Sequence, residues 1–257
     1  MMNLRLSHSQ VRTFLECPRI WEWRYLLKKP EIRTSRLLAG SVYHAGIEYA
    51  LKKKMNNELI FDDEIKTIIN NKWDAETSSG VYADDEGDAV ETRSIEWGED
   101  DPEILRNIVS DLACFYNKTI VPTLEPVAVE KKLEGIVGGV PFLGYADVIL
   151  KGPGVIDHKL AKRRMDQGTA NKDLQISAYA CLLKSPIWGA FHQALDQKKQ
   201  DINIVTTIRT KGDMDWYEML VEKVAQAMQT GIYPPNPLTW KCGPTCSYEL
   251  ECRILMG

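Results

Sequence analysis

The sequence lacks any long apolar run, and its charge is nearly balanced. No window of the 257 residues approaches the roughly 20 uninterrupted apolar residues that a helix needs to cross a bilayer. The first residues, MMNLRLSHSQ, lack the apolar core of a signal peptide. The net charge of −4 argues against a protein that coats nucleic acid by charge alone, although a small groove needs only local lysines. We therefore expect a soluble, cytoplasmic protein that binds no membrane.

Cysteine is scarce and unevenly placed. Six cysteines in a cytosolic chain do not suggest a disulfide scaffold, because that compartment keeps thiols reduced. Cys114 and Cys181 each lie alone in an apolar helical pattern, which predicts buried thiols. The other four are Cys17, near the start, and Cys242, Cys246 and Cys252, which crowd together near the C-terminus.

Helical patterns dominate the first half of the chain. Ser7 and Gln10 stand at the spacing of a capping box, and Pro18 interrupts the apolar pattern that follows, so we expect two short helices or one kinked helix. Residues 78–101 are acidic and poor in apolar side chains, as in DDEGD, and predict a solvated loop or mobile insertion. Helices are predicted over residues 7–27, 36–54, 62–75 and 102–119.

The second half predicts a β-sheet. VAVEKKLEGIV, VPFLGYADVIL and GVIDHKL are strand-like runs joined by Gly-Gly and by Lys-Gly-Pro-Gly, turns that make antiparallel neighbours. A helix over 171–184, the strand DINIVTTIRT and a helix over 213–230 follow. This order predicts an α/β fold with a mixed central sheet flanked by helices.

Two acids and a lysine lie at the ends of predicted strands. Adjacent antiparallel strands could bring Asp147 and Asp157 together, and two close carboxylates repel unless a cation lies between them. Mg²⁺ or Mn²⁺ suits such oxygen ligands. Lys159 points to the same strand face as Asp157, where it could hold a water and stabilise developing charge. Metal-assisted phosphodiester hydrolysis needs these parts, although the triplet alone favours an ordinary exposed Asp–Lys pair.

Other polar side chains recur at helical spacing. Gly40, His44 and Glu48 form one stripe, from which the histidine could reach a metal on the sheet, although a lone helical histidine is more often structural. Gln175 and Tyr179 have the same i, i+4 relation on the helix after the third strand. They could bond a lysine or substrate, or form ordinary half-buried polar packing.

A basic run follows the third strand. Lys162, Arg163 and Arg164 could grip phosphates, and a solvated basic turn would look the same.

The terminal cysteines have metal-ligand spacing. CGPTCSYELEC has the form C-x3-C-x5-C, so a tetrahedral site needs a fourth ligand, for which Cys17 is the evident candidate. Four thiolates suit a [4Fe–4S] cluster or Zn²⁺, and one remote plus three close cysteines fits the cluster better. The alternative is a set of reduced surface cysteines without a metal. A bound metal would clasp the C-terminal tail to the first helix.

Taken together, these residues resemble the RecB-type branch of the PD-(D/E)XK nuclease superfamily over nearly the whole chain. The similarity is carried by SHSQVRTFLECPRIWEWRYL, GSVYH, VEKKLEGIVGGVPFLGYADVI, VIDHK, LQISAYACLL and the terminal cysteines. The chain is especially similar to the iron–sulfur members, which include nuclease domains of recombination helicase–nucleases and a CRISPR-associated adaptation nuclease.

The resemblance implies a restriction-endonuclease-like fold and roles for the matching residues. His44, Asp147, Asp157 and the backbone carbonyl of His158 would bind Mg²⁺ or Mn²⁺. Lys159 would be the catalytic lysine, with Gln175 and Tyr179 as the motif on the following helix. Glu130 lies where such proteins often carry an acid of less defined purpose. The candidate cluster ligands are Cys17, Cys242, Cys246 and Cys252; the first gap of three residues, where two is commoner, leaves zinc or a less stable cluster open.

The resemblance also implies the domain organisation. Residues 1–257 would form a single nuclease domain with a core at about 36–54 and 125–210. A helical insertion would cover about 55–120, and Cys17 with 242–252 would form the clasp.

The expected function is a metal-dependent DNA exonuclease that acts on single strands or duplex ends. One alternative is a CRISPR-associated nuclease that trims DNA for spacer integration, and another is a non-catalytic DNA-binding subunit of a recombination complex. The chain contains no G-x-x-x-x-G-K-[ST] phosphate loop, so a helicase partner would be another protein.

Overall fold

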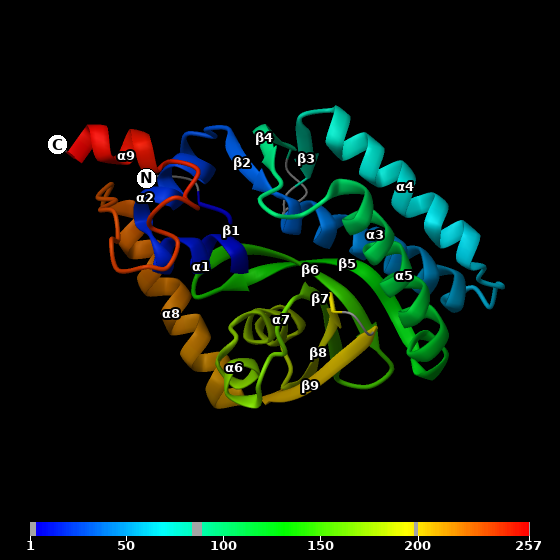
Figure 1. Cartoon of the computed structure of the whole chain (residues 1–257). Helices are drawn as coiled ribbons and strands as arrows, with labels where there is room; N and C mark the ends of the chain where they lie inside the picture. The colour runs from blue at the N-terminus through cyan, green and yellow to red at the C-terminus, as the bar shows by residue number, and fades with distance from the viewer. Residues whose placement is uncertain (1–3, 84–88, 198–199, 257) are drawn as a thin grey trace.

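Two layers of helices cover the two faces of a mixed β-sheet (Figure 1). The computed structural model describes residues 4–83, 89–197 and 200–256. The strands of the main sheet are β1 (Leu6–Ser7), β5 (Pro126–Val137), β6 (Val140–Leu150), β7 (Gly154–Ala161), β8 (Ile187–Leu195) and β9 (Asp201–Arg209). Within the described residues these six strands follow the order β1-β6-β7-β8-β9, and β5 also pairs with β6.

The predicted three-stranded meander is confirmed. β5, β6 and β7 are antiparallel neighbours in sequence order. The turn between β5 and β6 consists of Gly138 and Gly139, both with positive φ. A Cβ atom on Gly138 would lie 2.3 Å from the backbone oxygen of Glu218, so this position requires glycine.

Strand β8 is absent from the sequence prediction. It runs parallel to β7 and antiparallel to β9, which makes the sheet mixed. Nearly all of its side chains are buried, so IWGAFHQAL shows no alternation of apolar and polar residues. A strand covered on both faces loses the period-two signal on which strand prediction depends.

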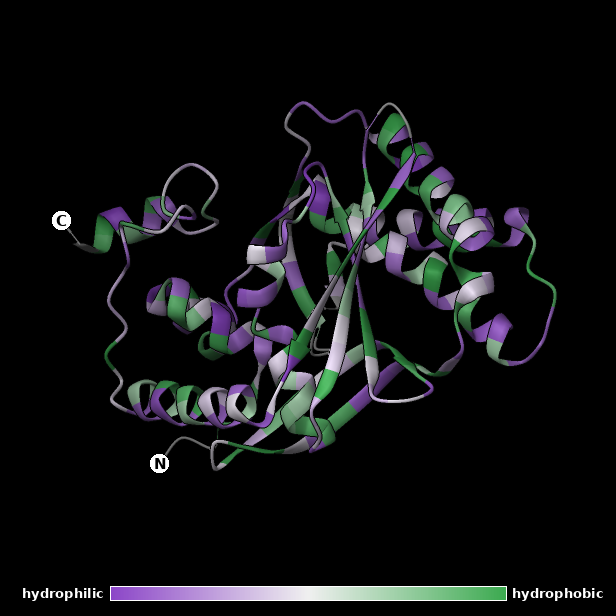
Figure 2. Cartoon of the chain, turned by 90° about the horizontal axis from the view of Figure 1, so that it is seen from below, coloured by the Kyte–Doolittle hydropathy of each residue, from purple (hydrophilic) through white to green (hydrophobic). Residues whose placement is uncertain are grey.

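Several of the helices beside the sheet are amphipathic, and Figure 2 shows hydrophobic and hydrophilic residues banded along them. The described helices are α1 (His8–Glu16), α2 (Pro18–Trp21), a π-helical turn (Glu22–Leu26), α3 (Ser35–Met55), α4 (Asp62–Ser78), α5 (Pro102–Thr119), α6 (Gln167–Lys172), α7 (Gln175–Leu183), α8 (Lys211–Gln229) and α9 (Glu249–Met256). The predicted kink is present, because Pro18 begins α2. In the part of the chain that the structure covers, no helix is both long and apolar enough to cross a membrane.

Each face of the sheet has its own hydrophobic core. Val155 and Phe191 pack with residues of α1, α6, α7 and α8, while Ile156 and Ala190 pack with residues of α3, α4 and α5. Successive side chains of a strand point to opposite faces, so β7 and β8 contribute to both cores. The sheet is thereby fixed from both sides.

A small second sheet lies in the region predicted as a loop. β3 (Val81–Ala83) and β4 (Ala89–Glu96) pair antiparallel, and β4 pairs with β2 (Glu31–Thr34). The prediction of a loop throughout residues 78–101 is therefore wrong where these strands lie, and DDEGD falls outside the described residues. The acidic composition concealed the strands, because several residues of β4 are exposed and contribute little apolar signal.

Candidate active site

Asp147 and Asp157 meet where strands β6 and β7 separate. The β6–β7 ladder ends at the pair Val148–Ile156, and the next step in this register brings the two aspartates opposite one another. Beyond that pair, the backbone N–H of His158 donates to Oδ2 of Asp147 at 2.7 Å. Both carboxylates are buried, at 7% and 1% exposure. The Asp147 carboxylate therefore takes the place of a backbone acceptor in the sheet ladder, and this hydrogen bond fixes its position.

Helix α3 brings His44 to this point. Its Nε2 lies 3.0 Å from the carbonyl oxygen of His158, and its Nδ1 lies 3.5 Å from Oδ2 of Asp147. Mg²⁺ bound at roughly 2.1 Å in an octahedron holds neighbouring ligand atoms about 3.0 Å apart. The spacing of the histidine and the carbonyl thus fits two adjacent ligands of such an ion.

Glu130 approaches the same histidine from strand β5. Its carboxylate oxygen lies 4.0 Å from Nδ1 of His44. Ligand atoms of His44, Glu130 and Asp147 all lie within 4.8 Å of one another. The backbone of Glu130 has a φ of 49°, a left-handed conformation that is costly for a residue with a side chain. This strained residue therefore adds a further carboxylate beside the proposed metal ligands.

The electrostatics of the cluster favour a bound cation. Burial opposes protonation of His44, but the charges of Asp147, Glu130 and Asp157 outweigh it and raise its pKa to about 9. Burial also raises the pKa of Asp157, to about 7, despite the neighbouring Lys159. Burial acts against ionisation of Asp147 too, yet His44 and His158 hold its pKa below the ordinary value. The cluster takes up protons because it carries excess negative charge, which a divalent cation would neutralise.

Lys159 is held between a carboxylate and an amide. Its Nζ lies 2.8 Å from Oδ2 of Asp157, at an angle that leaves this oxygen without a hydrogen bond. The ammonium donates instead to Oε1 of Gln175 at 2.9 Å. Gln175 donates to the hydroxyl of Tyr179 at 2.8 Å, and that hydroxyl donates to the carbonyl of Tyr145 at 2.6 Å. Burial would lower the pKa of Lys159, but Asp157 raises it, so the amine stays protonated.

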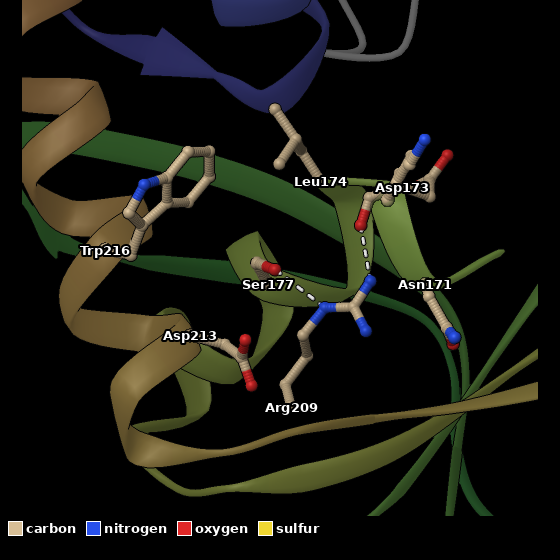
Figure 3. Close-up of a pocket in the computed structure, with 8 residues that line it drawn as sticks. Asn171, Asp173, Leu174, Ser177, Arg209, Asp213 and Trp216 are labelled. Atoms are coloured by element: carbon tan, nitrogen blue, oxygen red, sulfur yellow. Dashed lines mark hydrogen bonds between the residues drawn. The ribbon is translucent and has the colours of Figure 1, made fainter. Parts of the chain in front are cut away.

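A buried arginine fixes the start of the helix that carries Gln175 (Figure 3). Arg209 donates to the hydroxyl of Ser177 at 2.8 Å and to the carbonyls of Ala170 and Asp173 at 3.2 and 2.5 Å. It lies beside a cavity of about 400 Å³ formed by α6, α7, β9 and α8. None of the predicted site residues is among the described residues that line this cavity. Its importance for the site is the anchoring of α7.

The basic run after β7 is only partly available. Lys162 forms an ion pair with Asp100 at 3.4 Å, and Arg164 pairs with Asp201. Arg163 is exposed on the same turn. A phosphate at Lys162 would therefore compete with an acidic side chain.

The four predicted cluster ligands lie in one region but are not in contact as a group. Burial raises the pKa of Cys246, and the neighbouring Cys17, Cys242 and Cys252 raise it further. The backbone N–H of Asn236 donates to the sulfur of Cys17 at 3.4 Å. Among the described residues, no three of these sulfur atoms lie within 4.8 Å of one another. The four thiols thus share one region without forming a compact group of three.

Sequence reasoning missed two residues behind the site, Tyr116 and His192. Both are buried, and the hydroxyl of Tyr116 contacts ring nitrogens of His158 and His192. A histidine inside the apolar run IWGAFHQAL was the signal that could have pointed to a buried polar contact.

Comparisons with known proteins bear on the family and the fold of this chain. A sequence profile described as the PD-(D/E)XK nuclease superfamily matches residues 5–253. Among solved structures, a candidate exonuclease from Eubacterium rectale matches with a TM-score of 0.56 and 12% identity, over 97% of this chain and 87% of that chain. The structure of the protein SSO0001 matches with a TM-score of 0.35 and 13% identity, over 95% and 94% of the two chains. A search of curated proteins gave no significant match.

Proposed function

Since the chain belongs to the PD-(D/E)XK nuclease superfamily, we propose that it is a metal-dependent DNA exonuclease that acts on single strands or duplex ends. The predicted restriction-endonuclease-like fold is confirmed by the profile match and by the mixed sheet flanked by helices. The RecB-type branch remains a prediction. The observation that carries the proposal is the convergence of Asp147, Asp157, His44 and Lys159 at the separation of β6 and β7.

His44, Asp147, Asp157 and the carbonyl of His158 would hold Mg²⁺ or Mn²⁺. The carboxylate and carbonyl oxygens fit such ions, and the excess negative charge described above gives the site a reason to bind one. When bound, the cation supplies an acidified water and positive charge beside the scissile phosphate. Oδ2 of Asp157 accepts no hydrogen bond from the described residues, and the ammonium of Lys159 lies 2.8 Å from it.

Lys159 would act as a fixed positive charge and hydrogen-bond donor. Its pKa is raised rather than lowered, so it is a poor base. Gln175 occupies one of its three donor positions, and Asp157 lies beside it, which holds the ammonium where charge develops on the phosphate. Tyr179 fixes Gln175 and thereby the direction of the amine.

The preference for exonuclease action rests on resemblance. The Eubacterium rectale protein is named as an exonuclease candidate, and the likeness to it is one of fold. Lys162 and Arg163 would contact the DNA backbone near the end of β7. The alternatives are a CRISPR-associated nuclease that trims DNA and a non-catalytic DNA-binding subunit, and a helicase, recombination or CRISPR protein would be the partner. The intact cluster of acids and lysine favours an enzyme over the second alternative.

The four cysteines would hold a [4Fe–4S] cluster, with structural zinc as the alternative. Sulfur atoms bound to one zinc at about 2.3 Å lie about 3.8 Å apart in a tetrahedron. A cluster spaces them more widely, because each cysteine binds a different iron. The one remote and three close cysteines in the sequence remain the support for the cluster.

The proposal can be tested with the purified chain and three labelled substrates: linear single strands, linear duplex and circular single strands. With Mn²⁺ or Mg²⁺ we expect both linear substrates to shorten and the circle to persist, and EDTA should stop the reaction. Asp157→Asn and Lys159→Ala should lose activity while thermal unfolding stays cooperative. Full activity in both variants would contradict the mechanism, and cutting of the circle would replace exonuclease by endonuclease action.

A further inference from the structure

A buried polar chain lies behind the acidic cluster. Two of the four histidines of the sequence lie there, although histidine is rare in this protein. Along β7 the side chain of His158 points to the opposite sheet face from Asp157 and Lys159, toward the core formed by α3, α4 and α5. There it meets Tyr116 of α5 at a ring-centroid distance of 5.1 Å.

Tyr116 joins two histidines through one hydroxyl. Its oxygen lies 2.8 Å from Nε2 of His158 and 2.7 Å from Nδ1 of His192. His192 stands beside His158 in the parallel pairing of β8 with β7. The exposures of Tyr116, His158 and His192 are 0%, 2% and 4%, so water does not compete for these bonds.

The donor and the acceptor of each hydrogen bond in this polar chain can be assigned by starting from the Asp147 carboxylate at its end. Nδ1 of His158 lies 3.5 Å from Oδ2 of Asp147, and an ionised carboxylate only accepts, so the proton belongs on Nδ1. Nε2 of His158 then accepts from the Tyr116 hydroxyl, whose oxygen accepts from Nδ1 of His192. Every link thus has one donor and one acceptor.

The same residue, His158, touches the cluster at three atoms. Its backbone N–H and its ring both face Oδ2 of Asp147, and its carbonyl faces His44. A ring that is hydrogen-bonded on both nitrogens cannot rotate freely, and the backbone that carries it is restrained with it. An apolar trio would fill this core without the cost of burying three polar groups. The polar chain therefore indicates a requirement for orientation.

We propose that Tyr116 and His192 are positioning residues of the nuclease centre, which hold His158 so that its N–H, ring and carbonyl set the geometry of Asp147 and of the metal site. This inference rests on the proposed function. It assigns a role to two residues on α5 and β8 that lie outside the resemblance motifs. Outer-shell partners of metal ligands commonly tune affinity in this way.

The test uses Tyr116→Phe in the full chain, with two readouts. Mn²⁺ binding is measured by calorimetry without DNA, and the Mn²⁺ concentration that gives half-maximal cleavage is measured with it. We expect both constants to rise about tenfold in Tyr116→Phe. Tyr217→Phe is the matched control, because Tyr217 is also fully buried and its hydroxyl forms no hydrogen bond with the described residues. Its metal constants should equal those of the wild type.

A second variant keeps the proposal testable if the first fails to fold. His192→Phe removes the donor to Tyr116 and retains an aromatic ring. It should weaken Mn²⁺ binding about threefold, less than the tenfold or more lost with a direct outer-shell partner, because His192 lies one hydrogen bond further from Asp147 than Tyr116 does. Because the links act in series, the double variant should bind Mn²⁺ no more weakly than Tyr116→Phe alone. Unchanged metal constants in both single variants, with lower thermal stability only, would overturn the inference. A wild-type chain that binds Mn²⁺ but cuts no DNA would overturn the proposed function and leave this binding test intact.

Discussion

The acidic cluster and the cysteine group differ in how they are held. Each acidic residue lies on a strand of the main sheet, and His44 lies in the middle of a long helix. Cys242 and Cys246 lie in turns, and Cys252 lies on α9, at the periphery of the molecule (Figures 1 and 2). In the cluster, ligand atoms already meet at 3.0 to 4.0 Å; in the cysteine group no three sulfur atoms come within 4.8 Å.

This difference separates a site built by folding from a site that a metal would complete. Asp147 and His44 are fixed by hydrogen bonds to the backbone of His158, so a cation would enter a partly formed geometry. The C-terminal segment also has contacts of its own. Ser247 accepts from the N–H of Ile32 at 3.1 Å, and Tyr248 donates to the carbonyl of Lys29 at 3.1 Å. Metal loss should therefore loosen the clasp without releasing the segment entirely.

The largest expected effect is at the acidic cluster. Asp157→Asn should reduce cleavage about a thousandfold, the order lost when a group that stabilises the transition state is removed. The same change should raise the free energy of unfolding by about 1 kcal/mol, because it removes a buried charge that the native state holds unfavourably. Cleavage assays and urea titration at pH 8 without metal check both parts. A variant that loses stability together with activity would show that the cluster is a structural element.

The second effect concerns the clasp. Cys246→Ser should abolish bound iron and reduce the unfolding temperature by about 5 °C, since metal ligation contributes to folding. Cleavage should fall less than tenfold, because the acidic cluster is held independently. Metal analysis of anaerobically purified protein and its absorption near ~400 nm test whether a [4Fe–4S] cluster is bound.

Cys114→Ala supplies the control for the clasp, because this buried thiol is remote from the other cysteines in sequence and packs in the α3–α5 core. It should keep its full metal content. Colourless wild-type protein with one zinc per chain would replace the cluster by zinc. A thousandfold loss of cleavage in Cys246→Ser would show that the acidic cluster is not held independently of the clasp.

The sequence allowed the acidic cluster to be anticipated, because its signal is local. Asp157 and Lys159 are two residues apart, and Gly138 with Gly139 marks the turn that pairs β5 with β6. The alternation of the strands then places Asp147 opposite Asp157. The structure brings these residues together with His44, while their catalytic roles remain predictions.

The polar chain behind the cluster could not be anticipated. Tyr116, His158 and His192 come from segments 42 and 34 residues apart, and their contact depends on the packing of α5 against β7 and β8. β8 itself is concealed by burial on both faces, and β4 by its acidic composition. Local sequence patterns report one face of one element, and these features arise only from tertiary contacts.

The third effect is a pH dependence of stability that originates behind the cluster. The pKa of His192 is lowered to about 3 by burial, whereas in the unfolded chain it takes the ordinary value near 6.5. Between these values the unfolded state binds the additional proton, so stability falls as the pH falls through this window, by up to about 1.4 kcal/mol per pH unit. His192→Phe should reduce this slope. Denaturant titrations of both proteins at pH 7, 5.5 and 4.5, with chelator present, measure the difference; equal slopes would contradict it.

The smallest expected effect concerns the path of the DNA, over the acidic cluster or over the cysteine region. Lys162 lies just beyond the cluster and pairs with Asp100, whereas Lys241 lies beside the cysteines and pairs with Glu16. If single-stranded DNA passes over the acidic cluster, Lys162→Gln should weaken DNA binding only a few fold, because the lysine gives up an ion pair to reach a phosphate. The slope of log affinity against log salt should decrease by about 0.7, the contribution of one phosphate contact on a single strand. Lys241→Gln should leave the slope unchanged. Binding of a labelled oligonucleotide across a salt series, with each variant made in Asp157→Asn protein, measures both slopes. A smaller slope for Lys241→Gln and an unchanged slope for Lys162→Gln would mean that DNA passes over the clasp. The cysteine region would then have a binding role as well as a structural one.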